Sequence, residues 1–318
     1  MGWFTGNFSR EVPVHRETPF RIRVNGPCKV QGYQGDMARM RGVGSAVERE
    51  GLWVLQGPTK VEAPPWAWVR MEAFDGPLKV VGLPEGRLEV QKGHGPLKAQ
   101  EVRAVHIQGV SGPVVLEDVT ESATLENIRG PVKVNPCPGT LEAQVTGPVK
   151  VYCPEPAGRR LALRVRGPVA VQVPAEARLH GRIQAERGVH VEGIHQQPAA
   201  QSPTEVRWEA ADPETALQLD IVAQGPKARV SIGPAPAAMD ADVADMTDLG
   251  LGFARTMTAL FGRLFGGGGK TARTKTATSP ARSRGSESMD EARQRILHML
   301  AQGKITAEEA ERLLQALE

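Results

Sequence analysis

The sequence predicts an all-β fold: a β-solenoid (β-helix) built from Gly-Pro repeats of about 18 residues, followed by a small C-terminal αα-hairpin. Three observations support this prediction. A Gly-Pro dipeptide recurs at a nearly constant spacing, short alternating aliphatic and charged stretches follow it, and the periodicity becomes helical near the C-terminus. We therefore expect a solenoid domain over residues 1–234, an amphipathic or capping helix over 235–265, a disordered basic linker over 266–287 and a helical hairpin over 288–318.

The Gly-Pro dipeptides set the length of the repeat. Their glycines are Gly26, Gly57, Gly76, Gly95, Gly112, Gly130, Gly147, Gly167 and Gly225. From Gly57 to Gly167 the steps are 19, 19, 17, 18, 17 and 20 residues; the first interval, 31, is interpreted as one step plus an insertion, and the last, 58, as about three steps. A β-sandwich with ordinary Gly-Pro turns is the alternative, but Greek-key connections do not readily give so constant a step.

Each repeat is expected to hold two short strands and a sharp corner. The stretch Leu78-Lys79-Val80 is typical, because its alternation places aliphatic side chains on one face and charge on the other. Proline has no N–H and a fixed φ, which suits the first residue of a strand, and the glycine before it can take a conformation that other residues resist. Stacked coils would bury a continuous core, and roughly ten of them would make a rod on the order of 50 Å long.

Two kinds of charged residue recur within the repeats. Lysine stands three residues after the glycine in six of the nine repeats, at Lys29, Lys60, Lys79, Lys98, Lys133 and Lys150. Stacking would align them, most regularly Lys79, Lys98, Lys133 and Lys150, in a basic stripe that is either a solvated face or a surface for a polyanion or an anionic membrane. The carboxylates Glu89, Glu126 and Glu142 also recur once per repeat, and we expect a solvated ladder rather than a catalytic pair.

The sequence holds no motif of catalysis. The seven histidines lack metal-site spacing, and no nucleotide-binding loop or nucleophile motif occurs, so we expect no catalytic, cofactor-binding or metal site, no cofactor and no enzymatic activity. The net charge of +3 is too small to indicate nucleic acid as a partner. Cys137 and Cys153 lie 16 residues apart, close to one coil, and are expected to be stacked core thiols, with a redox or metal pair as the alternative.

The repeats resemble the bacterial "putative adhesin" β-solenoid domains of unknown function and, more loosely, the bactofilins. The resemblance rests on the Gly-Pro-[Leu/Val]-Lys-Val pattern and covers roughly residues 20–233. It implies a solenoid fold, and the bactofilin likeness implies a polymer-forming cytoskeletal role.

Beyond the repeats, an apolar stripe with helical spacing precedes a basic segment. The stripe consists of Leu249, Phe253, Met257, Leu260, Phe261 and Leu264. A helix of this kind either caps the open end of the solenoid or lies in a membrane interface. The linker that follows carries basic residues among Gly, Ser, Thr and Ala, and attraction to anionic lipid is one interpretation of it.

The last 30 residues predict a helical hairpin. Ser288 and Glu291 form one capping box, Gly303 ends the first helix, and Thr306 and Glu309 form a second capping box. The apolar side of the two helices is formed by Ile296, Leu297, Leu300, Ile305, Leu313, Leu314 and Leu317. This segment resembles the SHOCT-like short helical hairpins of bacterial proteins, which implies oligomerisation or protein contact and no chemistry.

These observations favour a non-enzymatic scaffold or interaction protein whose C-terminal hairpin binds a second copy or another protein. A membrane-surface-associated sensor or regulator of envelope stress is the first alternative, and a bactofilin-like filament the second. The chain begins without a basic and apolar leader, so we expect a cytoplasmic protein, with an anionic membrane surface at the inner face as a further partner.

Overall fold

The computed structural model describes residues 6–234, and this part of the chain is all β, with 23 strands and no helix. The all-β prediction is therefore confirmed for these residues. The chain divides into two compact units, Met1–Gly267 and Gly268–Glu318, and every described residue belongs to the first. The predicted helix over 235–265, the linker and the hairpin over 288–318 lie outside the described residues, so their boundaries stay predictions.

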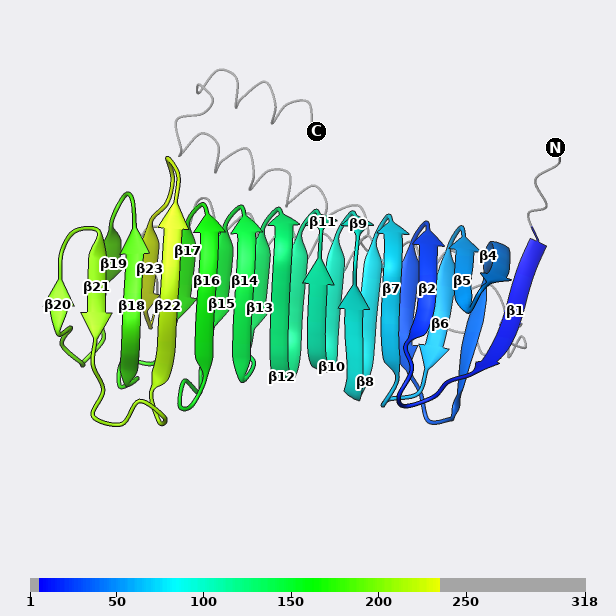
Figure 1. Cartoon of the computed structure of the whole chain (residues 1–318), viewed down its shortest axis with the longest axis horizontal. Helices are drawn as coiled ribbons and strands as arrows, with labels where there is room; N and C mark the ends of the chain where they lie inside the picture. The colour runs from blue at the N-terminus through cyan, green and yellow to red at the C-terminus, as the bar shows by residue number, and fades with distance from the viewer. Residues whose placement is uncertain (1–5, 235–318) are drawn as a thin grey trace, which may run out of the picture. The chain divides into compact units, whose positions relative to one another are not determined.

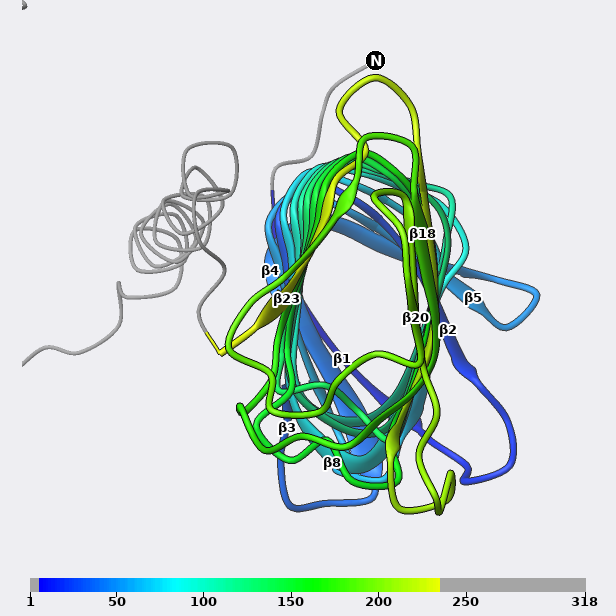
Figure 2. The same ribbon diagram turned by 90° about the vertical axis from the view of Figure 1, so that its left-hand side faces the viewer.

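The strands form two rows of parallel strands that face each other across one core (Figures 1 and 2). The first row runs, in spatial order, through β5 (Leu52–Gln56), β2 (Phe20–Asn25), β7 (Trp68–Asp75), the second halves of β8 (Leu78–Val90), β10 (Leu97–Gln108) and β12 (Val114–Arg129), then β14 (Thr140–Thr146), β16 (Arg160–Arg166), β22 (Leu217–Gln224) and β18 (Leu179–Ala185). The two-residue strands β9 (Gly93–His94) and β11 (Val110–Ser111) extend it.

The second row contains the residues that follow each glycine corner. It runs through β6 (Thr59–Ala63), β3 (Cys28–Gly32), the first halves of β8, β10 and β12, then β13 (Val132–Asn135), β15 (Val149–Tyr152), β17 (Val169–Gln172), β23 (Val230–Gly233) and β19 (Val189–Val191). Each strand of one row is joined through a corner to a strand of the other, so every repeat contributes a layer to both rows.

The core lies between the two rows because the side chains alternate. In β14 the buried residues Leu141, Ala143 and Val145 alternate with exposed ones, and β15 repeats this with Val149 and Val151. Strands that are in register place like residues above one another, so the inward side chains form continuous aliphatic columns. Aromatic side chains contribute little to these columns, consistent with the 4% aromatic content.

Glycine is required at the corners by backbone geometry. Gly130 has a φ of 145°, and a Cβ added there would lie 2.5 Å from the carbonyl oxygen of Gly112 in the neighbouring layer. Gly112 and Gly147 stand in the same relation to their neighbours, with contacts of 2.4 and 2.5 Å. The corner glycines thus stack so closely that no side chain fits, which explains why the dipeptide recurs so strictly.

The order of the layers departs from the order of the sequence at both ends. The strands β5 and β6 lie outside β2 and β3, and β18 and β19 lie outside β22 and β23. The interpretation of the last 58-residue interval as about three steps is wrong: it contains one further corner, at Gly188, and an antiparallel hairpin. At each end the chain builds a cap and then returns to pair with an inner layer.

Antiparallel strands cover both ends of the stack. At one end β4 (Met37–Arg49) pairs antiparallel with both β5 and β6, and β1 (Gly6–Pro13) pairs antiparallel with β4. At the other end β21 (Glu205–Trp208) pairs antiparallel with β18, and β20 (Ala200–Gln201) pairs antiparallel with β21. The last layer is thereby covered in both rows at the β4 end, whereas at the β21 end only the first-row strand β18 is covered and β19 pairs with β23 alone.

Candidate functional site

The second row aligns the recurring lysines. Lys98 is in register with Lys79, Lys79 with Lys29, and Lys133 with Lys150. This line of half-buried lysine side chains is interrupted between Lys98 and Lys133, where Val115 takes the equivalent position. We call the residues Lys60, Lys29, Lys79, Lys98, Lys133 and Lys150 the lysine row.

Carboxylates neutralise the lysine row only in places. Lys98 Nζ lies 2.5 Å from Glu117 Oε2, and Lys60 Nζ lies 2.6 Å from Glu62 Oε1. Partial burial, together with the charges of Lys79 and Lys60, lowers the pKa of Lys29, although Glu62 opposes this. Repulsion between the stacked ammonium groups, as between like charges on adjacent strands, therefore adds to the larger effect of burial.

The predicted carboxylate ladder does not form. Glu89 is in register with His106, His106 with Thr124, and Thr124 with Glu142. Glu126 lies outside this line, in register with Gln108. Its displacement arises because the number of residues between a first-row strand and the next corner differs from repeat to repeat.

The two stacked cysteines lie together in the core. Cys137 and Cys153 are both fully buried and have free thiols. Hydrogen bonding with Cys153, followed by burial, raises the pKa of the Cys137 thiol. Across residues 6–234 no group of three or more His, Cys, Asp or Glu side chains could hold a metal ion. The pair is therefore placed as core packing, and nothing in its surroundings supplies further metal ligands.

The sequence reasoning missed a group of arginines on the first row. Arg129, Arg164 and Arg166, with Lys92, line a groove of about 660 Å³. Arg129 and Arg166 each stand directly before a Gly-Pro corner, and this shared position was the available signal. It was not decisive because a single arginine before a turn is ordinary on a solvated surface.

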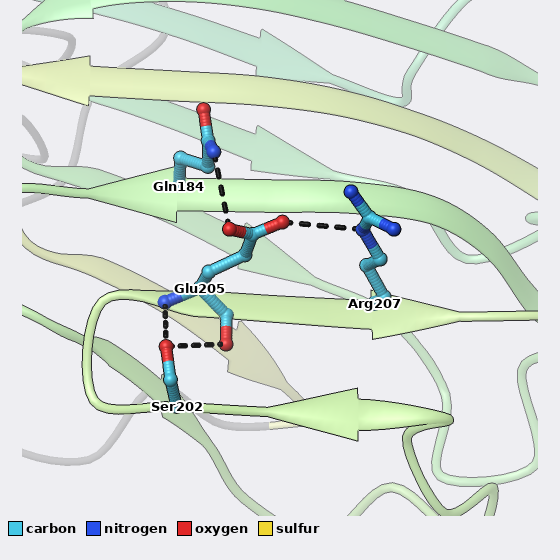
Figure 3. A network of polar contacts seen from close by, with 4 residues as sticks. All are labelled: Gln184, Ser202, Glu205 and Arg207. Carbon is cyan, nitrogen blue, oxygen red and sulfur yellow. Dashed lines mark hydrogen bonds and ion pairs between the residues drawn. The ribbon is translucent and has the colours of Figure 1, made fainter.

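A polar network fixes the cap at the β20–β21 end (Figure 3). Gln184 Nε2 donates to Glu205 Oε2 at 3.2 Å, and Arg207 Nε donates to Glu205 Oε1 at 3.1 Å. Ser202 Oγ accepts from the Glu205 backbone N–H at 3.0 Å and thus closes the turn between β20 and β21. Glu205 therefore links β21 to β18, and Trp208 on β21 is 1% exposed over the end of the core.

The remaining predicted site residues lie outside the described part of the chain. These are the apolar stripe between Leu249 and Leu264 and the hairpin side between Ile296 and Leu317. Among residues 6–234, no helix has the length and apolar character to cross a bilayer.

Comparisons with known proteins identify one segment of the chain. Residues 291–318 match the family model of the SHOCT-like domain. No curated protein matches the chain. A crystal structure of a "putative cell adhesion protein" from Clostridium sporogenes is 10% identical, and the match covers 72% of this chain and 99% of that chain with a TM-score of 0.20. A TM-score this low does not establish a shared fold or a shared role.

Proposed function

We propose that the chain is a non-enzymatic interaction protein that assembles through its SHOCT-like segment, residues 291–318. The match of this segment to the SHOCT-like domain carries the proposal. Short helical hairpins of this kind are too small to bury a core alone, so their apolar side needs a partner. The stacked layers of residues 6–234 would act as a β-solenoid, a rigid body that the segment joins to a second copy or to another protein.

The capped ends favour a discrete assembly over a filament. End-to-end growth of stacked coils needs free parallel edges, whereas β4 covers both strands of the last layer at one end and β21 covers the first-row strand β18 at the other. The outer strand β1 carries Arg10, Glu11 and Pro13, and charge and proline are features that prevent strand edges from pairing. These features support the scaffold proposal against the bactofilin-like alternative.

A second candidate function is binding at an anionic membrane surface from the cytoplasmic side. The lysine row favours it, because a line of ammonium groups held on rigid strands attracts lipid phosphates. In this proposal the protein is peripheral at the inner membrane face and reports on the state of the envelope.

Substitution of Leu313→Asp in the full chain tests the first function. We expect the wild-type oligomer to become a monomer, because a charge on the apolar side of the predicted hairpin opposes its burial. The matched control is Gln315→Asp, which adds the same charge two residues away at a position that does not belong to the predicted apolar side. Light scattering gives the mass, and circular dichroism checks that the β content is unchanged.

Two measurements, the mass of Leu313→Asp and vesicle flotation, separate the candidate functions. If Leu313→Asp leaves the mass unchanged, self-association through the segment is wrong. Flotation of the wild type and of Leu313→Asp with vesicles that contain anionic lipid tests the membrane function by itself, since that function does not require assembly, and failure of both proteins to float would contradict it.

A further inference from the structure

The groove on the first row is formed where the repeat changes length. In β12 two residues, Glu126 and Asn127, stand opposite the single residue Gln144 of β14. Asn127 has a φ of 55°, and Gly109 in the neighbouring layer has a φ of 65°. Such β-bulges bend a strand and redirect its side chains. The bulged layers and the regular layers that begin at β14 thus both contribute residues to the lining of the groove.

Two arginines stand in one line along this groove. Arg129 is in register with Thr146, and Thr146 with Arg166. Both arginines are exposed, and neither has an ion-pair partner within residues 6–234. Because adjacent strands lie about 4.8 Å apart, the two side chains leave the sheet roughly 10 Å from each other. The two arginines therefore start from positions two strands apart, with Thr146 between them.

The other two cations of the groove have different roles. Arg164 Nη2 donates to Asp220 Oδ2 at 2.6 Å, and Arg164 Nη1 donates to the Asp220 carbonyl oxygen at 3.1 Å. This pairing fixes the arginine, and the hydrogen bond from Arg164 is the main reason that the pKa of Asp220 is lowered. Lys92 is exposed, lies between β8 and β9, and adds a further positive charge to the lining. Arg164 is thus held in place, while Lys92, Arg129 and Arg166 are available to a ligand.

The residues that line the groove include no carboxylate, which distinguishes it from its surroundings. The adjacent depression shares Arg164 with the groove, but there Arg160 and Arg164 stand beside the three carboxylates of Glu126, Glu142 and Asp220, so both signs of charge are present and nearly balance. A surface that is merely solvated mixes both signs in this way. The segregation of cations into the concave part is the arrangement expected where an anion binds.

We infer that this groove binds an elongated ligand that carries two oxyanion groups, carboxylate or phosphate, about 10 Å apart. Arg129 and Arg166 would each bind one group in the bidentate geometry that guanidinium favours. The amides of Asn127, Gln144 and Gln224 both donate and accept hydrogen bonds, which suits hydroxyl groups between the two anions. A volume of about 660 Å³ lies within the range of ligand sites.

The lining of the groove also disfavours single-stranded nucleic acid as the ligand. Proteins that bind such strands stack bases on aromatic side chains, and the lining contains none. The inference is independent of assembly through the SHOCT-like segment, because every residue it uses lies in the described layers.

Calorimetric titration of the full chain tests the inference with four probes: a short oligogalacturonate, a short linear polyphosphate, inorganic phosphate and a neutral oligosaccharide. We expect at least one of the two polyanions to bind, and the tighter one identifies the oxyanion. The double variant Arg129→Gln, Arg166→Gln should weaken that binding by about tenfold or more. The double variant Lys133→Gln, Lys150→Gln removes the same charge from the lysine row and should retain the affinity within about twofold.

Three results would overturn the inference. The first is that neither polyanion binds at low ionic strength. The second is that the lysine-row variant loses as much affinity as the arginine variant, which would indicate attraction by overall charge. The third is that inorganic phosphate binds as tightly as the polyanions, which would contradict a site with two separate binding points.

Discussion

The middle of the stack and its two ends are built by different means. Between β8 and β17 the layers follow the order of the sequence, all strands are parallel, and the same glycine corner recurs in each layer. At the ends the layers are out of order, the strands become antiparallel, and side-chain contacts specific to the cap appear. Repeated sequence is therefore enough to add further layers to the stack, whereas the ends of the stack depend on segments that do not follow the repeat.

The physical reason lies in the backbone groups of the outermost layer. Within the stack each strand finds hydrogen-bond partners on both sides, whereas a terminal strand leaves one edge open and one cross-section of the core exposed. Strand β21 provides both hydrogen-bond partners for the open edge and cover for the core, since it pairs with β18 and contributes the buried Trp208. Trp208 is in register with Gly181, where a side chain is excluded because an added Cβ would lie 2.0 Å from the carbonyl oxygen of Leu219.

The largest effect should come from removing that indole. We expect Trp208→Ala to destabilise the protein by about 3–5 kcal/mol and to cause association through the opened end. Leu125, 1% exposed in the middle of the stack, is the comparison: Leu125→Ala should cost about 2–5 kcal/mol without association. Both changes are made together with Leu313→Asp, so that assembly through the SHOCT-like segment does not obscure the result.

Urea denaturation measures the stability of these two variants, and light scattering measures their mass. If Trp208→Ala stays monomeric at every concentration, the cap contributes only stability and other features prevent end-to-end growth. Association of Leu125→Ala to the same extent would show that any loss of core packing suffices, and the contrast between middle and end would fail.

A pair of glycine substitutions sharpens the same comparison. Gly130→Ala in the middle should cost about 2–3 kcal/mol, because its φ of 145° suits only glycine and the new Cβ would lie 2.5 Å from a carbonyl oxygen. Gly51, in the turn between β4 and β5, has a φ of 74° and no atom within 4 Å of an added Cβ. Gly51→Ala should therefore cost only about 1 kcal/mol.

Thermal unfolding of the two glycine variants gives the difference directly. Equal losses would mean that φ strain alone determines the cost and that the close stacking of corner glycines has little energetic weight. A larger loss at Gly51 would reverse the order that the contacts predict.

The middle of the fold could be predicted from the sequence, and the ends could not. Alternation and Gly-Pro corners are local features, so residues such as Leu78 and Val80 reveal their strand and their buried side without knowledge of the neighbours. Which layer pairs with which is not local. Nothing in the period indicates that β22 inserts between β16 and β18, because each of these strands has the same alternation.

The same distinction applies to the candidate sites. The lysine row was predictable because each lysine stands three residues after a corner, and the second-row strand begins at that corner. In the first row, by contrast, the number of residues between a strand position and the next corner varies from layer to layer, because bulges of different length lie between them. Glu126 therefore leaves the expected ladder, and Arg129 and Arg166 come into line without an obvious signal. The SHOCT-like match lies outside the described residues and rests on the sequence alone.

The smallest expected effect concerns the lysine row, in which the stacking of like charges carries a cost. Because partial burial and, after it, the neighbouring lysines lower the pKa of Lys29, its charged form is disfavoured in the folded state. Lys29→Gln should therefore raise stability at neutral pH by on the order of a few tenths of a kcal/mol. The folded protein releases this proton before the unfolded chain does, so the penalty, and with it the gain, should shrink as pH rises toward the ordinary pKa of 10.5.

Lys98→Gln is the control in the same row, because Lys98 is paired with Glu117 and its replacement should bring no gain. Urea denaturation at low and high salt gives both values, and added salt should reduce the gain from Lys29→Gln by screening the repulsion. Equal effects of the two substitutions would mean that the row acts as a uniform solvated face. A gain confined to Lys29 would instead show that the regular stacking of the repeats keeps unfavourable charge in register, and that the carboxylates beside it relieve this only locally.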